Sequence, residues 1–284
     1  MAFRLKASDG SLEASVKRIA AEQLDKALAS IESQGPDRAI HAVRERCKKM
    51  RALLRLVRTA FPNYAEENAF LRDTARLVSR KRDAYVIRET FAALTGEPAQ
   101  IVAEPAQDIS ALLGECRLRL LAVKARTPSW SVDERGWDAL SGGFTKTTRD
   151  ARRAAKTARQ HPDARSHHEL RKQVKYHGFH CQILRPIKPR KLKRRVREAA
   201  RLADALGRHH DLVLLTSHLT GAPTDFISVR RSHEILMKAS NSSAALERVA
   251  RRRARKLLAQ RPRRLSKSLG KQWKTWAAEE KFEL

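Results

Sequence analysis

The chain has 284 residues, of which 42% are hydrophobic and 32% are charged. The hydrophobic share is high enough for a packed core, which excludes a chain that is disordered throughout. Its 60 Lys and Arg residues against 31 Asp and Glu residues leave a formal charge of +29. So large a positive charge costs self-repulsion, which indicates an anionic partner such as nucleic acid, an anionic membrane surface or a phosphate polymer.

Targeting and redox signals point to the cytoplasm. No apolar run approaches the roughly 18 residues that a membrane-spanning helix needs. The opening sequence MAFRLKASDGS lacks the apolar stretch and the cleavage site of a signal peptide. Cys47, Cys116 and Cys181 have no metal-ligand spacing and form no even disulfide set. We therefore expect a cytoplasmic protein with no membrane span and no cofactor or metal.

The composition predicts an all-α fold, because good helix formers dominate and alternating β-branched runs are absent. In the first half, Gly35-Pro36 and Phe61-Pro62 break the helical pattern, and Asp37 is placed to cap the second helix. The predicted helices cover residues 11–33, 38–60, 64–80, Asp83 to before Gly96, and 108–126.

The segment Thr127–Gly136, with Pro, Ser and Trp residues, is the predicted boundary between the halves. Gly207 predicts a helix stop, with a new helix opening near Asp211. We expect Trp273, Trp276 and Phe282 to pack back on the helices. The predicted second-half helices cover residues 134–160, 165–185, 190–206, a stretch from Asp211, and a long stretch after Pro223 to Gln260, bent at Asn241-Ser242-Ser243.

Two polar motifs recur in the same order. His41-x-x-Arg44-x-x-x-Lys48 returns as His168-x-x-Arg171-x-x-x-Lys175 at an offset of 127, and Arg80-x-x-Asp83 returns as Arg208-x-x-Asp211 at an offset of 128. Two motifs at nearly one offset predict two related helical halves of about 127 residues. We expect both aspartates to cap helices and orient an arginine rather than act as bases.

Cations recur at helical spacing in and around these motifs. His41, Arg44, Lys48, Arg51, Arg55 and Arg58 follow intervals of 3, 4, 3, 4 and 3, which places them on one helix face beside an apolar stripe. Few carboxylates accompany them, so the face is a candidate anion-binding surface. Further basic faces carry Arg72, Arg76 and Arg80 in the first half and Arg194, Arg197, Arg201 and Arg208 in the second.

The order His41-x-x-Arg-x-x-x-Lys, Arg82-Asp83, His168-x-x-Arg-Lys-x-x-Lys and Leu206-Gly207-x-x-x-Asp211 resembles the CHAD domain family. The resemblance implies two pseudo-symmetric four-helix bundles that form one compact helical unit with a basic central surface. It also implies non-catalytic binding of inorganic polyphosphate at that surface and association with polyphosphate granules. The domain would cover 11–260, with halves 11–127 and 128–260, a tail at 1–10 and a basic tail at 261–284.

The candidate polyphosphate-binding residues combine the motifs with the further basic faces. They are His41, Arg44, Lys48, Arg51, Arg55, Arg72, Arg76, Arg80, His168, Arg171, Lys172, Lys175, Arg194, Arg197, Arg201 and Arg208. Polyphosphate has no bases to stack, which suits a chain with only 5% aromatic residues. Arginine also offers planar forks that match phosphate oxygens.

Two alternatives stay open. The clusters Arg251–Arg253 and Arg261–Lys267 favour a sequence-independent nucleic-acid-binding protein. Nucleic acid is also expected as a weaker polyanionic partner beside polyphosphate. The dipeptide His210-Asp211 is similar to that of the all-helical His-Asp metal phosphohydrolases, although ten histidines make such a pair easy to find by chance.

Overall fold

The computed structural model describes residues 3–78, 80–97, 108–221 and 229–283, with the backbone alone at 80–85 and 229. Within those ranges every regular element is a helix, which confirms the all-α prediction. None of the described helices is long and apolar enough to cross a bilayer. The segment between the predicted helix that ends before Gly96 and the one that begins at residue 108 falls largely outside the described residues.

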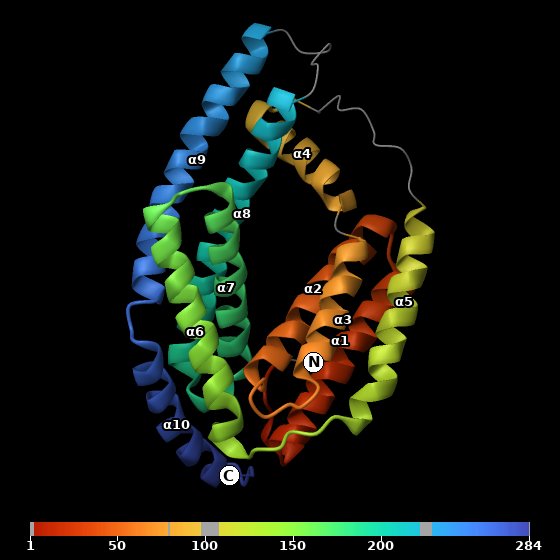
Figure 1. Cartoon of the computed structure of the whole chain (residues 1–284), viewed down its shortest axis with the longest axis vertical. Coiled ribbons are helices and arrows are strands. Elements are labelled where there is room, and N and C mark those ends of the chain that lie inside the picture. Colours follow the sequence, from red (N-terminus) through yellow and green to blue (C-terminus); the bar gives the residue numbers. More distant parts are fainter. Residues whose placement is uncertain (1–2, 79, 98–107, 222–228, 284) are drawn as a thin grey trace.

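In the first half, α1, α2, α3 and α5 pack on one another, while α4 lies apart from them (Figure 1). Helix α1 begins after Ser11, whose hydroxyl oxygen accepts a hydrogen bond from the Ala14 amide. Gly35 rather than Asp37 precedes α2, and Pro36 takes its first position, where the missing amide is not needed. The bounds are α1 Leu12–Ser33, α2 Pro36–Leu56, α3 Tyr64–Leu77, α4 Arg80–Thr95 and α5 Ile109–Arg126.

In the second half, α6 packs against α7, α7 against α8, and α8 against α9. A final helix, α10, packs along α6 (Figure 1). Trp273 and Trp276 of α10 and the following Phe282 are buried, as predicted from their apolar character. The bounds are α6 Gly136–Gln160, α7 Ala164–Ile183, α8 Pro189–Gly221, α9 Val229–Leu257 and α10 Pro262–Glu279.

Helix α8 overturns the predicted stop at Gly207. The helix runs unbroken from Pro189 to Gly221, so Asp211 opens no new helix. Gly207 is buried, and a Cβ built on it would lie 3.0 Å from Nη2 of Arg171 on α7. The glycine therefore provides room for a neighbouring side chain rather than a chain reversal. Helix α9 likewise stays helical through Asn241-Ser242-Ser243.

Helix α4 packs on the second half of the chain. Its Phe91 joins Leu215 and Leu219 of α8 and Ile235 of α9 in a small separate core. Figure 1 shows α4 beside α8, away from the other first-half helices. The packing of α4 on α8 and α9 therefore joins the two halves at one end of the molecule.

The halves also meet along α2, which contacts α6 and α7. The largest core cluster includes Leu53 and Leu54 from α2 together with Phe144 from α6 and Ile183 from α7. Gly143 makes the contact possible, because a Cβ there would lie 2.0 Å from the Leu56 carbonyl oxygen. Because this cluster contains residues from both halves, the halves form one compact unit.

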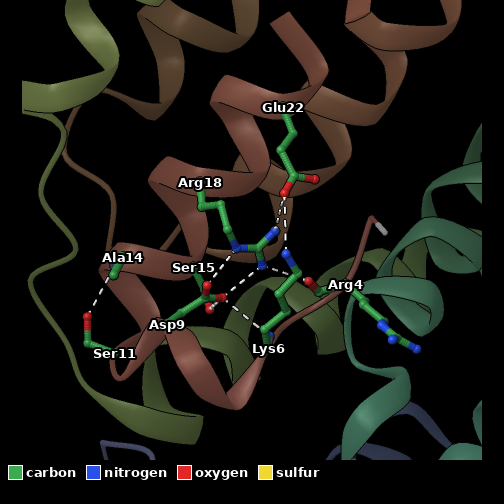
Figure 2. A network of polar contacts seen from close by, with 8 residues as sticks. All are labelled: Arg4, Lys6, Asp9, Ser11, Ala14, Ser15, Arg18 and Glu22. Atoms are coloured by element: carbon green, nitrogen blue, oxygen red, sulfur yellow. Dashed lines mark hydrogen bonds and ion pairs between the residues drawn. The ribbon is translucent and has the colours of Figure 1, made fainter. Parts of the chain in front are cut away.

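The N-terminal segment is held by a network of polar contacts around Arg18 (Figure 2). Arg18 donates through Nε and Nη2 to the two Asp9 carboxylate oxygens at 2.6 and 2.7 Å, and through Nη1 to Glu22 at 3.0 Å. Its Nη2 also donates to the Arg4 carbonyl oxygen. The Leu5 amide donates to the Ile183 carbonyl oxygen of α7, so this segment also joins the halves.

The contact at Gly143 provides a test of the seam between the halves. Gly143→Ala should lower the free energy of unfolding by about 3 kcal/mol or more, because the methyl group overlaps the α2 backbone and forces α6 away. Gly114→Ala is a matched control on α5 with open space around its Cβ, and should stabilise by up to about 1 kcal/mol. Equal urea midpoints for the two variants would contradict the proposed close contact.

Candidate anion-binding site

The predicted cation stripe lies on α2, the helix through which the halves meet. His41 at its outer end is exposed, whereas Arg44, Lys48, Arg51 and Arg55 are half-buried. The adjoining side of the helix is buried in the core, as its apolar spacing predicts. The stripe therefore lies at the edge of a packed interface, where its cations are partly shielded from water.

Arg58, the last member of the spacing pattern, lies beyond the end of α2. The helix ends at Leu56, four residues earlier than predicted. Arg58 Nη2 donates to Thr147 Oγ1 of α6 at 2.6 Å, and its Nε donates to the Arg55 carbonyl oxygen at 2.8 Å. Arg58 therefore joins the end of α2 to α6, and two of its donors are used within the fold.

Arg51 and Arg55 meet a tyrosine from the other half. The guanidinium carbon of Arg55 lies 4.4 Å from the ring centroid of Tyr176 on α7, and that of Arg51 lies 6.0 Å from it. Tyr176 is buried. Its ring face attracts both cations and so helps to hold the two guanidinium groups close to each other.

Few negative charges compensate this pair. Among the described residues, neither Arg51 nor Arg55 forms an ion pair, and Arg51 Nε donates to the neutral Asn68 side chain at 3.1 Å. Arg55 Nε is buried with no hydrogen-bond partner in the same part of the chain. Burial lowers the pKa of Arg51, and the positive charges of Arg55 and Arg72 lower it further. An anion at this point would relieve both the repulsion and the unpaired donor.

Helix α3 adds Arg72 to the same neighbourhood. Arg72 and the exposed Arg76 both pair with Asp73, at 2.8 and 3.3 Å. Arg80 follows at the start of α4, where its side chain and that of Asp83 lie outside the described residues. The backbone places Asp83 inside the first turn of α4 rather than at its cap.

In the second half, the packing of α7 on α8 brings the two polar motifs together. The rings of His168 and His210 lie 5.3 Å apart, and Arg171 lies against Gly207. Arg171 Nε donates to the Ala203 carbonyl oxygen at 3.4 Å. Partial burial, followed by the charges of His210 and Arg171, lowers the pKa of His168. Residues some 40 positions apart thus form one basic cluster.

The remaining members on α7 and α8 lie around this cluster or away from it. Lys175 is half-buried on α7, whereas Lys172 is exposed and pairs with Glu169. Arg194 and Arg201 line a different cavity of about 510 Å³ between α8 and α9, together with Arg252. Arg197 and Arg208 are exposed on α8. The candidate residues therefore do not gather into one pocket.

The family model for the CHAD domain matches residues 18–220. The chain belongs to the CHAD domain family. No curated protein matches the chain. The matched region of this CHAD domain runs from within α1 to the end of α8, so it includes the α2 stripe and both copies of each polar motif.

Two buried histidines of the CHAD domain were not singled out from the sequence. His180 Nε2 donates to the Ala52 carbonyl oxygen of α2 at 2.9 Å. His177 Nε2 accepts from Arg195 Nη2 at 3.1 Å, and its other ring nitrogen contacts Thr148 Oγ1 at 3.2 Å. Tyr176 was also not predicted as part of the site, because its partners Arg51 and Arg55 lie in the other half of the chain.

Metal and thiol chemistry find little support in the described residues. That part of the chain contains no group of three His, Cys, Asp or Glu side chains placed to hold a metal ion. All three cysteines are buried. Burial raises the pKa of Cys47 to about 12 and that of Cys181 to about 11, so both thiols stay protonated at neutral pH.

The contact between Gly207 and Arg171 can be tested with a double-mutant cycle. In the Arg171→Ala background, Gly207→Ala should raise stability by up to about 1 kcal/mol, because alanine is the better helix former. With Arg171 present the same change should gain less or destabilise, since the new methyl group displaces the guanidinium. Denaturant unfolding should give a coupling of at least about 0.5 kcal/mol. Additive effects would contradict the contact.

The buried histidines predict that acid destabilises the fold. Burial, aided by Arg58, lowers the pKa of His180 to about 3, whereas in the unfolded chain its pKa lies near the ordinary value of 6.5. The unfolded state therefore binds a proton that the folded state excludes, and stability falls as pH drops from about 6.5 toward 3.

Each such histidine should lower the free energy of unfolding by about 2 kcal/mol between about pH 7 and about pH 5. His180→Phe should flatten the dependence of the melting temperature on pH, whereas the same change at the exposed His233 should leave it as it is. An unchanged slope in His180→Phe would show that this imidazole is already charged in the folded protein.

Proposed function

We propose that this CHAD domain binds inorganic polyphosphate without catalysing its turnover. The observation that carries the proposal is the Arg51–Arg55 pair: two half-buried guanidinium groups oriented by Tyr176, with no ion pair among the described residues and one buried donor that has no partner. Phosphate oxygens would complete these hydrogen bonds in place of water. Family membership supports polyphosphate as the source of those oxygens.

The proposed contact surface extends from this pair along both motif helices. In the first half it comprises the rest of the α2 stripe with Arg72 and Arg76 of α3 and Arg80 of α4. In the second half it comprises the cluster of His168, Arg171, Lys172 and Lys175, with Arg194, Arg197, Arg201 and Arg208 of α8 as outlying contacts. The repeated motifs support the idea that the two halves are pseudo-symmetric bundles, each of which contacts the polymer.

Binding would be driven mainly by the release of counterions, because each phosphate neutralised by Lys or Arg sets a condensed cation free. The affinity should therefore fall steeply with salt. His168, whose pKa is lowered by burial and by neighbouring cations, would gain a proton as phosphate approaches, which makes binding tighter toward acid pH. Such a protein would reside in the cytoplasm, at polyphosphate granules.

Sequence-independent nucleic-acid binding is the alternative function. Cations concentrated on α9 and at the start of α10 favour it. In the described part of the chain, however, the rings at the α2 site are the buried Tyr176 and the half-buried Tyr64, which give bases no exposed platform. The relative affinity for the two polymers decides between them. Inorganic polyphosphate should displace duplex DNA at a far lower phosphate concentration, and displacement in the opposite order would favour nucleic acid.

The site is tested by removing two charges while leaving neutral polar side chains in their place. Arg51→Gln with Arg55→Gln should weaken binding of defined-length polyphosphate by about 10- to 100-fold, since each lost charge-assisted hydrogen bond contributes on the order of 1 kcal/mol or more. The slope of log affinity against log salt should fall by between about 1 and 2. Isothermal titration calorimetry over a salt series measures both.

The matched control is Arg117→Gln with Lys124→Gln on α5, which removes the same charge from exposed positions that pair with Glu32 and Asp25. This variant should bind almost as well as the unmodified protein. If both double variants weaken binding equally, overall charge rather than the α2 site holds the polymer, and the proposed site is wrong.

A further inference from the structure

A second concentration of positive charge lies on the second half, away from the cation stripe on α2. Helices α6 and α9, with the start of α10, enclose a groove of about 1450 Å³ whose base is formed by α7. Eleven Lys and Arg side chains line it, five from α6, four from α9 and two from Arg261 and Arg263. Glu247 is its one carboxylate.

These cations are exposed and almost entirely without compensating charge. All of them except the half-buried Arg152 are exposed. Within the described part of the chain, Arg251 is the one member that forms an ion pair, with Glu247 at 2.5 Å. Eleven positive charges and one negative charge leave a net of +10 in a single concavity. A cleft lined by one sign of charge concentrates ions of the opposite sign.

Small side chains create the hollow between the two walls. Ala155 and Ala158 of α6 face the groove together with Ala250 and Ala254 of α9. Where larger residues would have closed the space between the helices, these methyl groups leave it open. The cationic side chains of α6 and α9 extend into solvent from either side of these alanines.

The nature of the lining identifies the class of anion. Ala158, Ala250 and Ala254 are already buried, so a partner helix would gain little by covering them. No Phe, Tyr or Trp lines the groove, and its one imidazole, that of His167, is buried, so stacked bases have no exposed platform. What remains is a double row of guanidinium forks, which suits the oxygens of a phosphate chain.

The groove is separate from the stripe on α2. Helix α9 packs on α8, α4 and α6, whereas α2 packs on α1, α3, α5, α6 and α7. The groove lines α6 from Arg149 onward, whereas α6 meets the end of α2 earlier, around Gly143. In Figure 1, α9 lies on the side of the second half that faces away from α2. Arg252 also lines the cavity between α8 and α9 that holds Arg194 and Arg201, so the basic surface continues around α9.

We propose that the groove between α6 and α9 is a second binding site for a phosphate polymer, which lets one molecule bridge two polymer segments. The proposal rests on the proposed function and extends it from holding a chain to joining chains. The arginine-lined part of α6, from Arg149 to Arg159, is about 15 Å long, enough for several consecutive phosphates. Two sites on one rigid body would raise the avidity for long polymers.

The test counts binding sites with a polyphosphate that spans one helix face of about 15 Å but is too short to reach both sites. The groove variant is Arg153→Gln, Arg159→Gln and Arg255→Gln, all exposed positions without ion pairs in the described chain. The unmodified protein should bind two chains by calorimetry. The groove variant and the Arg51→Gln, Arg55→Gln variant should each keep one tight site, with the other weakened about 10- to 100-fold, and the combined variant should keep no tight site.

The charge control removes three exposed cations elsewhere, by Arg117→Gln, Lys124→Gln and Lys274→Gln, and should still bind two chains. With long polyphosphate, the unmodified protein and this control should form large light-scattering assemblies. Either single-site variant should reduce the scattering at least tenfold, because a protein with one site cannot bridge.

The outcomes separate the two proposals. If the unmodified protein binds one chain, lost in the α2 variant and kept in the groove variant, the groove proposal fails and the proposed function stands. If the unmodified protein binds no polyphosphate, the proposed function fails with it. If the groove variant loses single-stranded DNA of matched length but keeps both polyphosphate chains, the groove binds nucleic acid and the proposal is wrong.

Discussion

The contact of α2 with α6 and α7 is the constraint on which the charge arrangement depends. Gly143 lets α6 approach the end of α2, and the shared core buries the apolar side of α2 against the second half. Once that side is buried, the cation stripe can lie only along the edge of the interface. Tyr176 then meets Arg51 and Arg55 from across the seam. The same packing that stabilises the fold therefore holds the cations together.

A chain with a charge of +29 must also distribute its few carboxylates. Several of them stabilise the scaffold. Asp9 holds Arg18 near the N-terminus, and the buried Glu67 accepts two hydrogen bonds from Arg126, which joins α3 to the end of α5. These carboxylates lie away from the Arg51–Arg55 pair and from the groove between α6 and α9. Repulsion is thus left largely uncompensated between Arg51 and Arg55 and in the groove, where Glu247 pairs with Arg251 alone among the described residues.

Three histidines of α7 have two different physical roles. His168 lies at the surface beside other cations, where its charge can respond to an arriving anion. His177 and His180 are buried at the junction of α7 with α2, α6 and α8, where they act as neutral hydrogen-bonding groups. Position in the sequence does not separate these groups, because all three residues lie on α7. Burial does.

The sequence by itself determined the helical class, most helix positions and the spacing that aligns the cations on α2. These features depend on local propensity and on the 3.6-residue period, which act over a few turns. It also carried the repeated motifs that led to the CHAD domain family. The predicted stop at Gly207 was wrong. A glycine in a sequence indicates a helix end, and only the structure shows that this one leaves room for the Arg171 side chain.

Only the tertiary structure decided which cations meet. Arg51 and Arg55 lie more than a hundred positions from Tyr176, and no local pattern relates them. Arg194 and Arg201 were predicted to bind polyphosphate together with the cations of α2. In the structure they line a separate cavity with Arg252 of α9. The groove between α6 and α9 arises because alanines on two distant helices face one another. Local spacing sets the face of a helix on which a charge lies, whereas the packing of whole helices sets what that charge faces.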